Sequence, residues 1–447
     1  MNKGKLALGL AVATFYQQAY SSSFSEDSKA SVSSRSLYFE GDQRGPNGVD
    51  QRQSATGLKF DFTSGYTQGL IGFGLDTQGL LGVNLGGGIS PHSASTSNTI
   101  TPVDTDGTPV DNWSRLGANG KIKLSKTELK AGTALAPNLP ILVANDSRLL
   151  PQSFQGAVLT SREFESVTYT AGQLNRAIGR ASSNWAGISA GGRKGADAFR
   201  FVGADWKATK DLTLQYYYAQ LEDYYGQTFL GLTHDVQISP EQSLKTDLRY
   251  FNSHSDGENG SNTDYQYKNG YNAGALGEVN NNTWSAAFTY SLGGHSLTLG
   301  HQRVSDSGGM PYVTNGSLVD GRGRPEGEGG ASVYLYTDIM INNFTRAGEN
   351  SSFGLYRYDF AGLGVPGLKA QWTYVKGQDI RGIGNATTGR YSEWESDYRL
   401  DYAIQNGSLK GLGVSLRRAN YRTQLPTTTA QDQDQTRFYV NYTYSLW

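Results

Sequence analysis

Arginine is the residue type whose positions in this chain bear most directly on chemistry. Along segments in which apolar and polar residues alternate, certain arginines fall on the polar face: Arg249, Arg357, Arg399, Arg417 and Arg437. A guanidinium binds a planar carboxylate through parallel hydrogen bonds, and rings of Arg or Lys line pores that conduct anions. A series of these side chains along one passage would therefore lower the barrier for small carboxylates.

Neighbouring carboxylates offer a structural explanation for several of these arginines. Some of these arginines have an acidic neighbour on the same segment. For each of them, a salt bridge within the protein wall explains the arginine as well as contact with a solute does. The pairs are Asp247 with Arg249, Asp359 with Arg357, and Asp397 or Asp401 with Arg399. In a membrane strand such arginines should face the interior, because an arginine exposed to mid-membrane lipid costs about 2–4 kcal/mol. The alternation leaves the facing of some arginines ambiguous: Arg35, Arg52, Arg200 and Arg418.

Residues for catalysis or metal binding form no recognisable motif. The five histidines, none of which pairs with another at metal-ligand spacing, are His92, His234, His254, His295 and His301. The chain has no cysteine, which removes thiol nucleophiles, disulfides and zinc ribbons together. The glycine-rich stretch at 72–82 lacks the lysine and helix of a phosphate loop. We therefore expect a protein that is not an enzyme and that needs no cofactor.

One segment fails the alternation seen elsewhere. Residues 146–152 read DSRLLPQ, with Arg148 next to two leucines and a proline. The proline and the lack of period-two alternation argue against a strand. Either the arginine of this apolar, stiffened loop is held at a site of function, or it only caps backbone carbonyls.

Period-two alternation dominates the rest of the chain and predicts an all-β fold. Apolar faces bounded by tyrosine and tryptophan, with charged opposite faces, indicate a transmembrane antiparallel barrel, although a soluble sandwich also alternates. The strand segments have the length that a tilted strand needs to cross a bilayer, and short connections alternate with long, glycine-rich ones such as 253–282 and 305–331. The chain length supports about 16 to 18 strands, enough for an aqueous channel.

The N-terminus has the pattern of a secretory signal. Lys3 and Lys5 precede an apolar run from Leu6 to Phe15, which small residues follow. We expect residues 1–21 to be a signal peptide and residues 22–447 a single barrel domain; a short buried helix is the alternative for the first segment. The net charge of −1 argues against nucleic acid as a partner.

Long motifs in the chain resemble the OprD family of substrate-specific outer-membrane porins. The resembling segments cover nearly the whole chain after the signal: SRSLYFEGD (34–42), GYTQGLIGFGLDTQGLLG (65–82), SRLGANGKIKLSKTELKAG (114–132), LPILVANDSRLLPQSFQG (139–156), YYYAQLEDYYGQTFLGL (216–232), SLKTDLRYF (243–251), TYSLGGHSLTLGHQ (289–302) and YDFAGLGVPGL (358–368). The resemblance implies an 18-stranded barrel, monomeric or loosely trimeric, in the outer membrane. Its long extracellular loops would fold into the pore, which would take up small carboxylate-bearing nutrients.

The resemblance also implies roles for particular residues. Arg148 matches the arginine of the family's inward-folded third loop, while Arg35, Arg399 and Arg417 lie in segments that resemble those bearing its ladder of lumen arginines. Residues 307–313, which include Tyr312, resemble the seventh loop that lines the constriction opposite the third. One departure is the pair Arg417 and Arg418, since adjacent strand residues cannot both face the lumen without a bulge.

These observations favour passive, substrate-selective diffusion of amino acids or of aromatic or other organic acids through the outer membrane. The arginines, with Arg249 and Arg357 among them, would guide the carboxylate, and an acidic residue such as Asp401 could hold an amino group. Expected partners are the solute, outer-membrane lipid and lipopolysaccharide. Competing hypotheses are a structural or adhesive barrel, a barrel hydrolase, and a secreted soluble β protein.

Overall fold

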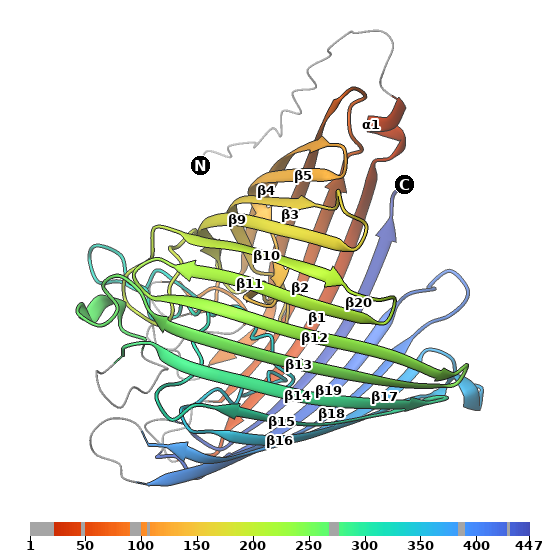
Figure 1. Cartoon of the computed structure of the whole chain (residues 1–447). Coiled ribbons are helices and arrows are strands. Elements are labelled where there is room, and N and C mark those ends of the chain that lie inside the picture. The colour runs from red at the N-terminus through yellow and green to blue at the C-terminus, as the bar shows by residue number, and fades with distance from the viewer. Residues whose placement is uncertain are drawn as a thin grey trace, which may run out of the picture.

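A closed β-barrel accounts for nearly all of the structure. The computed structural model describes residues 22–45, 50–89, 100–104, 108–267, 277–382, 389–426 and 430–447. Within these residues, 18 antiparallel strands form one sheet that closes on itself (Figure 1). The expected fold class and strand number are confirmed. The predicted signal segment, residues 1–21, lies outside the described residues and stays a prediction.

The barrel strands follow one another around the wall in chain order. They are β1 (Lys29–Gln43), β2 (Gln51–Thr63), β3 (Ile71–Ile89), β4 (Asn112–Leu124), β5 (Thr127–Leu135), β8 (Ser153–Ser161), β9 (Val167–Ile178), β10 (Phe199–Lys207), β11 (Leu212–Leu221), β12 (Tyr225–Ser239), β13 (Gln242–Ser255), β14 (Asn280–Leu292), β15 (His295–Val304), β16 (Asn350–Asp359), β17 (Leu368–Arg381), β18 (Arg390–Ala403), β19 (Gly413–Thr423) and β20 (Gln433–Ser445). The remaining elements are α1 (Ser22–Glu26), β6 (Asn138–Leu139), β7 (Leu142–Val143), η1 (Thr263–Tyr265) and η2 (Phe360–Leu363).

Pairing of the first strand with the last closes the sheet. β1 runs antiparallel to β20 from Ser31 opposite Ser445 to Gln43 opposite Gln433, while its other side pairs with β2. Every barrel strand thus has two neighbours, and no described strand presents a row of unpaired N–H and C=O groups to lipid. That condition is what allows β structure to span a membrane.

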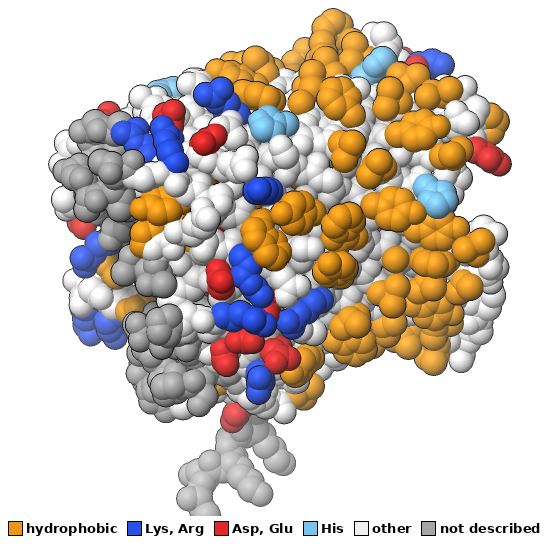
Figure 2. All heavy atoms as spheres, turned by 90° about the horizontal axis from the view of Figure 1, so that it is seen from below, with side chains coloured by type: hydrophobic (Ala, Val, Ile, Leu, Met, Phe, Trp, Pro, Cys, Tyr) orange, Lys and Arg blue, Asp and Glu red, His pale blue; other side chains and the backbone are white. Residues whose placement is uncertain are grey.

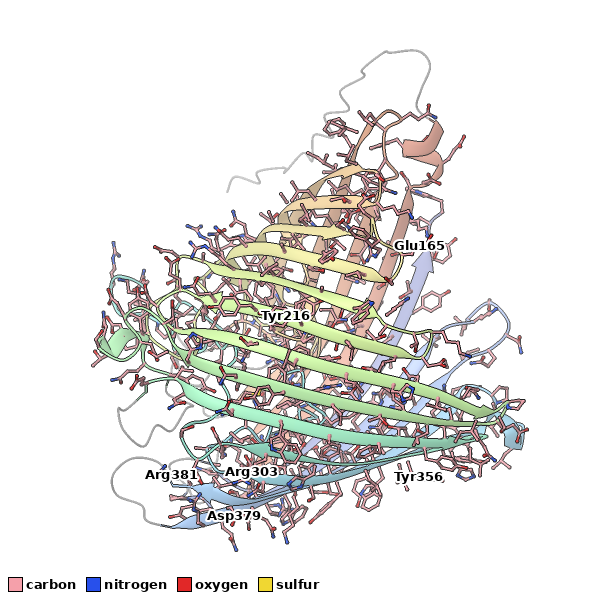
Figure 3. All side chains as sticks on the ribbon, in the orientation of Figure 1. Glu165, Tyr216, Arg303, Tyr356, Asp379 and Arg381 are labelled. Atoms are coloured by element: carbon pink, nitrogen blue, oxygen red, sulfur yellow. The ribbon has the colours of Figure 1, made fainter. Side chains whose placement is uncertain are left out.

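The side-chain alternation of the sequence becomes an outer and an inner face. Tyr216 on β11 is 51% exposed, whereas the next residue, Tyr217, is 1% exposed. Across the following strands, Tyr216 stands opposite Leu230, Leu230 opposite Tyr250, and Tyr250 opposite Trp284, so that an apolar row runs around the outside. The apolar side chains cover a broad band of the outer wall (Figure 2). Figure 3 shows Tyr216 and Tyr356 along this wall.

Connections at the two ends of the barrel differ in length, as expected. Helix α1 and the C-terminus lie at the end with short turns (Figure 1), such as 240–241 between β12 and β13 and 293–294 between β14 and β15. Long loops gather at the other end, which is extracellular by the usual rule for such barrels. The connection 222–224 is an exception, because it is short and yet lies at the long-loop end. Among the described residues, no helix is long and apolar enough to cross a membrane.

Three long connections enter the barrel rather than stand above it. We name them loop 3 (136–152), loop 4 (179–198) and loop 7 (305–349), and residues of all three pack against the inner wall. Part of the wall that they cover departs from the expected charged and hydrated lumen, because many inward side chains of β10 to β13 are aromatic and buried. These include Phe199, Phe201, Tyr217, Phe229 and Phe251, which form one apolar cluster with Ile188 of loop 4 and Met310 and Val313 of loop 7. An apolar inner wall fits here because folded loops, not water, cover it.

Candidate functional site

Loop 3 is fastened to the inner wall by two leucines. Leu149 and Leu150 are buried among Leu37, Phe39 and Tyr439. A Cβ atom on Gly57 of β2 would lie 2.9 Å from Leu150 Cδ2 and 3.3 Å from the Leu149 carbonyl oxygen, so only glycine gives the loop this close approach. The two leucines of DSRLLPQ thus hold loop 3 against the inner wall.

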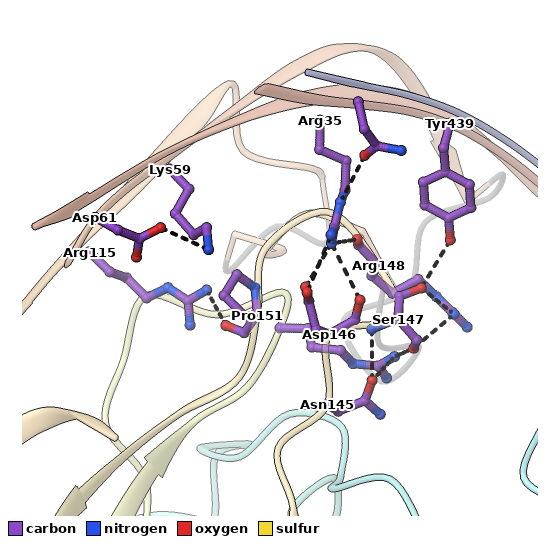
Figure 4. Close-up of polar contacts among 12 residues, drawn as sticks. Arg35, Lys59, Asp61, Arg115, Asn145, Asp146, Ser147, Arg148, Pro151 and Tyr439 are labelled. Carbon is purple, nitrogen blue, oxygen red and sulfur yellow. Dashed lines mark hydrogen bonds and ion pairs between the residues drawn. The ribbon is translucent and has the colours of Figure 1, made fainter. Parts of the chain in front are cut away.

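Polar contacts hold the same loop from its other side. Arg115, on β4, donates to the Pro151 carbonyl at 2.8 Å (Figure 4). It also donates to the Gly179 carbonyl at 3.0 Å, which joins loop 3 to loop 4. Asn145 donates its side-chain N–H to the Gly330 carbonyl of loop 7 at 3.1 Å. Loop 3 is therefore braced by both other inward loops, and these contacts fix its position in the lumen.

Arg148 lies inside this braced region and is only 8% exposed. Its guanidinium donates to the carbonyl and hydroxyl oxygens of Ser147 and sits 5.3 Å from the centre of the Phe39 ring. Burial, with the nearby charges of Arg437 and Arg180, lowers the pKa of Arg148 well below its ordinary value. Part of the capping hypothesis thus holds, because Arg148 does bind a backbone carbonyl.

Arg148, Arg180 and Arg437 form what we call the arginine cluster. Arg180, from loop 4, donates to the Ser147 hydroxyl at 2.7 Å, and Arg437, from β20, donates to the Met340 carbonyl of loop 7 at 2.6 Å. None of the three forms an ion pair with a carboxylate of any described residue. Glu328 and Asp338 lie within electrostatic reach of Arg180 and neutralise the cluster only in part, so the guanidiniums still add positive charge to the surrounding lumen.

A second set, the basic row, crosses the wall at one level of the sheet. Arg399 on β18 stands opposite Arg417 on β19, which stands opposite Arg437 on β20. Residues directly opposite in a sheet have Cβ atoms about 5 Å apart, so like charges there repel. Asp401 neutralises Arg399 at 2.6 Å, and the Tyr439 ring lies 4.6 Å from the Arg417 guanidinium. Arg417 keeps no carboxylate partner among the described residues.

Arg35 of β1 joins loop 3 to the wall. Its guanidinium forms two hydrogen bonds with the Asp146 carboxylate, at 2.7 and 3.3 Å, and a third with the Arg148 carbonyl at 2.8 Å (Figure 4). A hollow of about 270 Å³ lies beside this contact and is lined by Arg35, Lys59, Arg417 and Asn441 among others. The structure thus brings Arg35, Arg148, Arg399 and Arg417 to one side of the lumen.

Two other arginines of interest lie elsewhere. Arg249 binds Asp247 on its own strand at 2.7 Å, as the salt-bridge alternative suggested. It also stacks 3.9 Å from the ring centre of Tyr334 and so anchors loop 7. Arg357 is exposed on β16 and bonds to Gln371 at 2.8 Å. The suggested Arg357 pair with Asp359 is wrong, because Asp359 binds Lys369 at 2.9 Å instead.

Loop 7 faces loop 3 and has its own anchors. Tyr312 packs against the apolar cluster, and burial raises the pKa of its hydroxyl. Glu395 of β18 accepts backbone N–H bonds from Met340, Ile341 and Asn342 at 2.9–3.2 Å. Tyr312 is therefore a structural contact of loop 7 in this arrangement, and the loop is held by a wall carboxylate.

Several residues of the site were not singled out in the sequence. Arg180 lies in loop 4, a glycine- and serine-rich stretch without periodicity, so no pattern marked its direction. Arg115 and Tyr439 lie on strands, but nothing local shows that loops 3 and 4 reach them. Arg437 was placed on the polar face by alternation, and the structure confirms that it points inward.

Comparisons with known proteins agree over nearly the full length of the chain. The family model described as "outer membrane porin, OprD family" matches residues 22–446. The chain belongs to the OprD family. Porin D of Pseudomonas aeruginosa is 31% identical, over 100% of this chain and 97% of that protein.

Solved structures of related channels give the same architecture. The crystal structure of Pseudomonas aeruginosa OccK8 (OprE) is 40% identical, with a TM-score of 0.83 over 95% of this chain and 100% of that one. The structure of Pseudomonas aeruginosa OpdK with vanillate is 33% identical, with a TM-score of 0.79 over 95% and 100%. This OprD-family protein is therefore a porin of the bacterial outer membrane, a passive channel and not an enzyme.

Proposed function

We propose that this porin selects small carboxylate-bearing solutes, and that the basic row with the arginine cluster makes the selection. The observation that carries the proposal is the row itself: three in-register arginines on adjacent strands, of which only Arg399 has a carboxylate partner among the described residues. Such a row is electrostatically unfavourable for the fold alone, since opposite like charges destabilise a sheet. A passing carboxylate would relieve that repulsion.

The geometry also suggests how a solute would move. Arg35 and Arg417 line the same hollow, and Arg399 is the next strand neighbour of Arg417. A carboxylate bound to one guanidinium would have another within reach, so exchange would need no complete loss of contact. Conduction requires binding that is weak enough to release, which partly hydrated arginines permit.

The relative OpdK supports the solute class. Its structure contains vanillate, an aromatic carboxylate, and its barrel superposes on this chain with a TM-score of 0.79. We therefore propose aromatic acids, amino acids or other small organic acids as the solutes of this channel. Monomeric or loosely trimeric assembly stays a prediction.

Ion selectivity of single channels in planar bilayers tests the proposal. The variant is Arg399→Gln/Arg417→Gln, and we expect its permeability ratio for benzoate over potassium to fall about three- to tenfold, because two lumen charges are lost. The control is Arg418→Gln, which removes one positive charge from the next residue of β19, on the outer face.

Equal selectivity in the double variant and in the parent would overturn the proposed role of the basic row. A fall of the same size in the Arg418→Gln control would assign the effect to overall charge and not to the lumen. Lipid bilayers of phosphatidylcholine alone keep the outer face free of anionic lipid during the measurement.

A further inference from the structure

An apolar hollow lies on the outer face of the barrel wall. It has a volume of about 340 Å³ and lies over β16 to β19. Ala370 stands between larger neighbours, opposite Leu400 and beside Trp372, so its small side chain leaves the wall recessed there. The side chains around the recess are exposed and apolar, namely Tyr356, Trp372, Tyr398, Leu400 and Leu416. In a membrane this recess faces lipid.

A cluster of guanidiniums begins at the rim of the same hollow. Arg418, which lines the hollow, reaches the carboxylate of Asp434 at 3.3 Å. Arg44 and Arg422 bind the same carboxylate at 2.5 and 2.7 Å. Asp434 is fully buried, while the side chains of Arg44 and Arg418 are 51% and 42% exposed. The carboxylate therefore lies beneath the guanidiniums, and the surface they present is cationic.

This cluster lies on the outer face, against the expectation that strand arginines point inward. Arg417 takes the lumen side and Arg418 the lipid side of the same strand. Arg418 stands opposite Tyr398, whereas the next outward residue toward the short-turn end, Leu416, stands opposite Leu400 of the apolar band. Figure 2 shows basic and acidic side chains gathered between that band and the long-loop end. This level corresponds to the headgroups of the outer leaflet.

We propose that the hollow and the guanidinium cluster together bind one phosphorylated glycolipid of the outer leaflet. An acyl chain lies in the recess over Ala370, and a phosphate accepts hydrogen bonds from Arg418 and Arg44. A guanidinium has five N–H donors in a fixed fork, so an arginine that binds Asp434 still has donors for a phosphate. Acyl and phosphate subsites that adjoin at headgroup level match a lipid better than a soluble anion.

The acidic residues of this region set the limits of the phosphate subsite. Asp432 lies 3.9 Å from Arg422, and Glu40 binds Arg52 at 3.2 Å. Asp42 stands opposite Asp434 on β1. Asp432 and Asp42 lie beyond Arg418 toward the loop end, where the Arg44 side chain reaches back to Asp434, so they confine a phosphate to the guanidiniums above Asp434. The phosphate is thereby directed to Arg418, at the edge of the apolar band.

Native mass spectrometry of the full detergent-solubilised barrel tests the proposal. The probes are bisphosphorylated lipid A, phosphatidylglycerol and phosphatidylcholine, each added at equal concentration. We expect one lipid A molecule per barrel to be retained, and the two other lipids to be retained at least about tenfold less. In Arg44→Gln/Arg418→Gln, retention of lipid A should fall about tenfold, which corresponds to ~1.4 kcal/mol.

Two further variants separate the subsites from general effects. Ala370→Trp fills the recess and leaves every arginine in place, and it should also reduce lipid A retention. Arg303→Gln removes an exposed arginine of β15 outside the cluster, and it should leave lipid A retention unchanged. Single-channel conductance in phosphatidylcholine confirms that each variant is folded, since these side chains lie outside the lumen.

Certain outcomes would overturn the site. One is equal lipid A retention by the double arginine variant and the parent. Another is a loss of retention in Arg303→Gln as large as in the double arginine variant. The third is unchanged lipid A retention in folded Ala370→Trp. Equal retention of all three lipids would show nonspecific adhesion to the apolar band. None of these results bears on solute selection in the lumen, so the two proposals fail independently.

Discussion

At the scale of single residues, neighbours of the same type have opposite surroundings in this barrel. Arg417 and Arg418 differ by one position, yet one faces the lumen beside Tyr439 and the other faces outward beside Asp434. The cause is the two-residue period of a strand, which sends successive side chains to opposite faces. The role of a strand residue here thus depends on which face its position places it on, as well as on its residue type.

Arg148 is the residue whose contribution is hardest to separate from structure. It lies buried between loop 3 and Phe39, with Arg180 and Arg437 near it. Since its guanidinium is mostly covered, we propose that it acts on a solute through its field and not through lasting contact. Its position within the electropositive group supports that interpretation.

Replacement of Arg148 tests this field effect. In Arg148→Met, which retains most of the side-chain bulk, uptake of a carboxylate should fall about two- to fivefold more than uptake of a neutral solute of equal size. Liposome swelling measures both rates in one preparation. Equal losses for the two solutes would leave Arg148 only a steric role in bracing loop 3.

At the scale of elements, the inward loops are positioned by the wall and by one another. Loop 3 depends on the space above Gly57, on Arg115 and on Arg35. Loop 7 depends on Arg249 and on the backbone contacts of Glu395. Because few of these contacts lie within a single loop, the constriction is a property of the assembled barrel.

Gly57 provides a direct test of how the wall positions loop 3. In Gly57→Ala the new Cβ would meet Leu150 at 2.9 Å, and overpacking of this kind typically costs about 1–3 kcal/mol. We expect loop 3 to shift from the wall, which should increase current fluctuations and weaken benzoate selectivity in single-channel recordings.

Gly120→Ala is the matched control, since a Cβ there meets only the Ala131 carbonyl oxygen at 3.9 Å. It should behave as the parent does. If Gly57→Ala channels show no added current fluctuations and keep their benzoate selectivity, loop 3 does not depend on this close approach.

At the scale of the whole molecule, the closed sheet separates two environments. Outside, exposed apolar residues such as Phe288 form the band that meets lipid (Figure 2). Inside, side chains contact folded loops, ion pairs or the lumen. Figure 3 shows charged residues at the barrel ends, with Glu165 at the short-turn end and Arg303, Asp379 and Arg381 at the long-loop end. The outer wall is thus apolar between two polar rims.

A charge placed on this band should prevent stable insertion. Phe288→Arg puts a guanidinium toward lipid, and we expect a loss of about 2–4 kcal/mol in the free energy of unfolding from bilayers. Thr289→Arg is the paired control, because Thr289 faces inward and bonds to Thr298. Denaturant titration in lipid vesicles measures both, and equal stability of the two variants would contradict the assignment of faces.

Much of the architecture was predictable from local patterns. Alternation in segments such as 283–292 and 397–404 predicts strands and their outer faces, because period-two side-chain direction is a property of the backbone itself. The lengths of loops and turns could be predicted because they lie between recognisable strand segments. The resemblance of whole motifs indicated the family and the 18-strand count. The resemblance also marked loop 3 around Arg148.

What the tertiary structure alone decided is which groups meet. The sequence by itself determined a membrane barrel with arginines on its inner face; it did not determine that Arg148, Arg180 and Arg437 converge from two loops and the last strand. Nor did it show that Arg249 anchors loop 7, or that Arg418 borders a recess in the outer wall. Periodicity is local, whereas these contacts join residues far apart in the chain, and only closure of the sheet and folding of the loops bring them together.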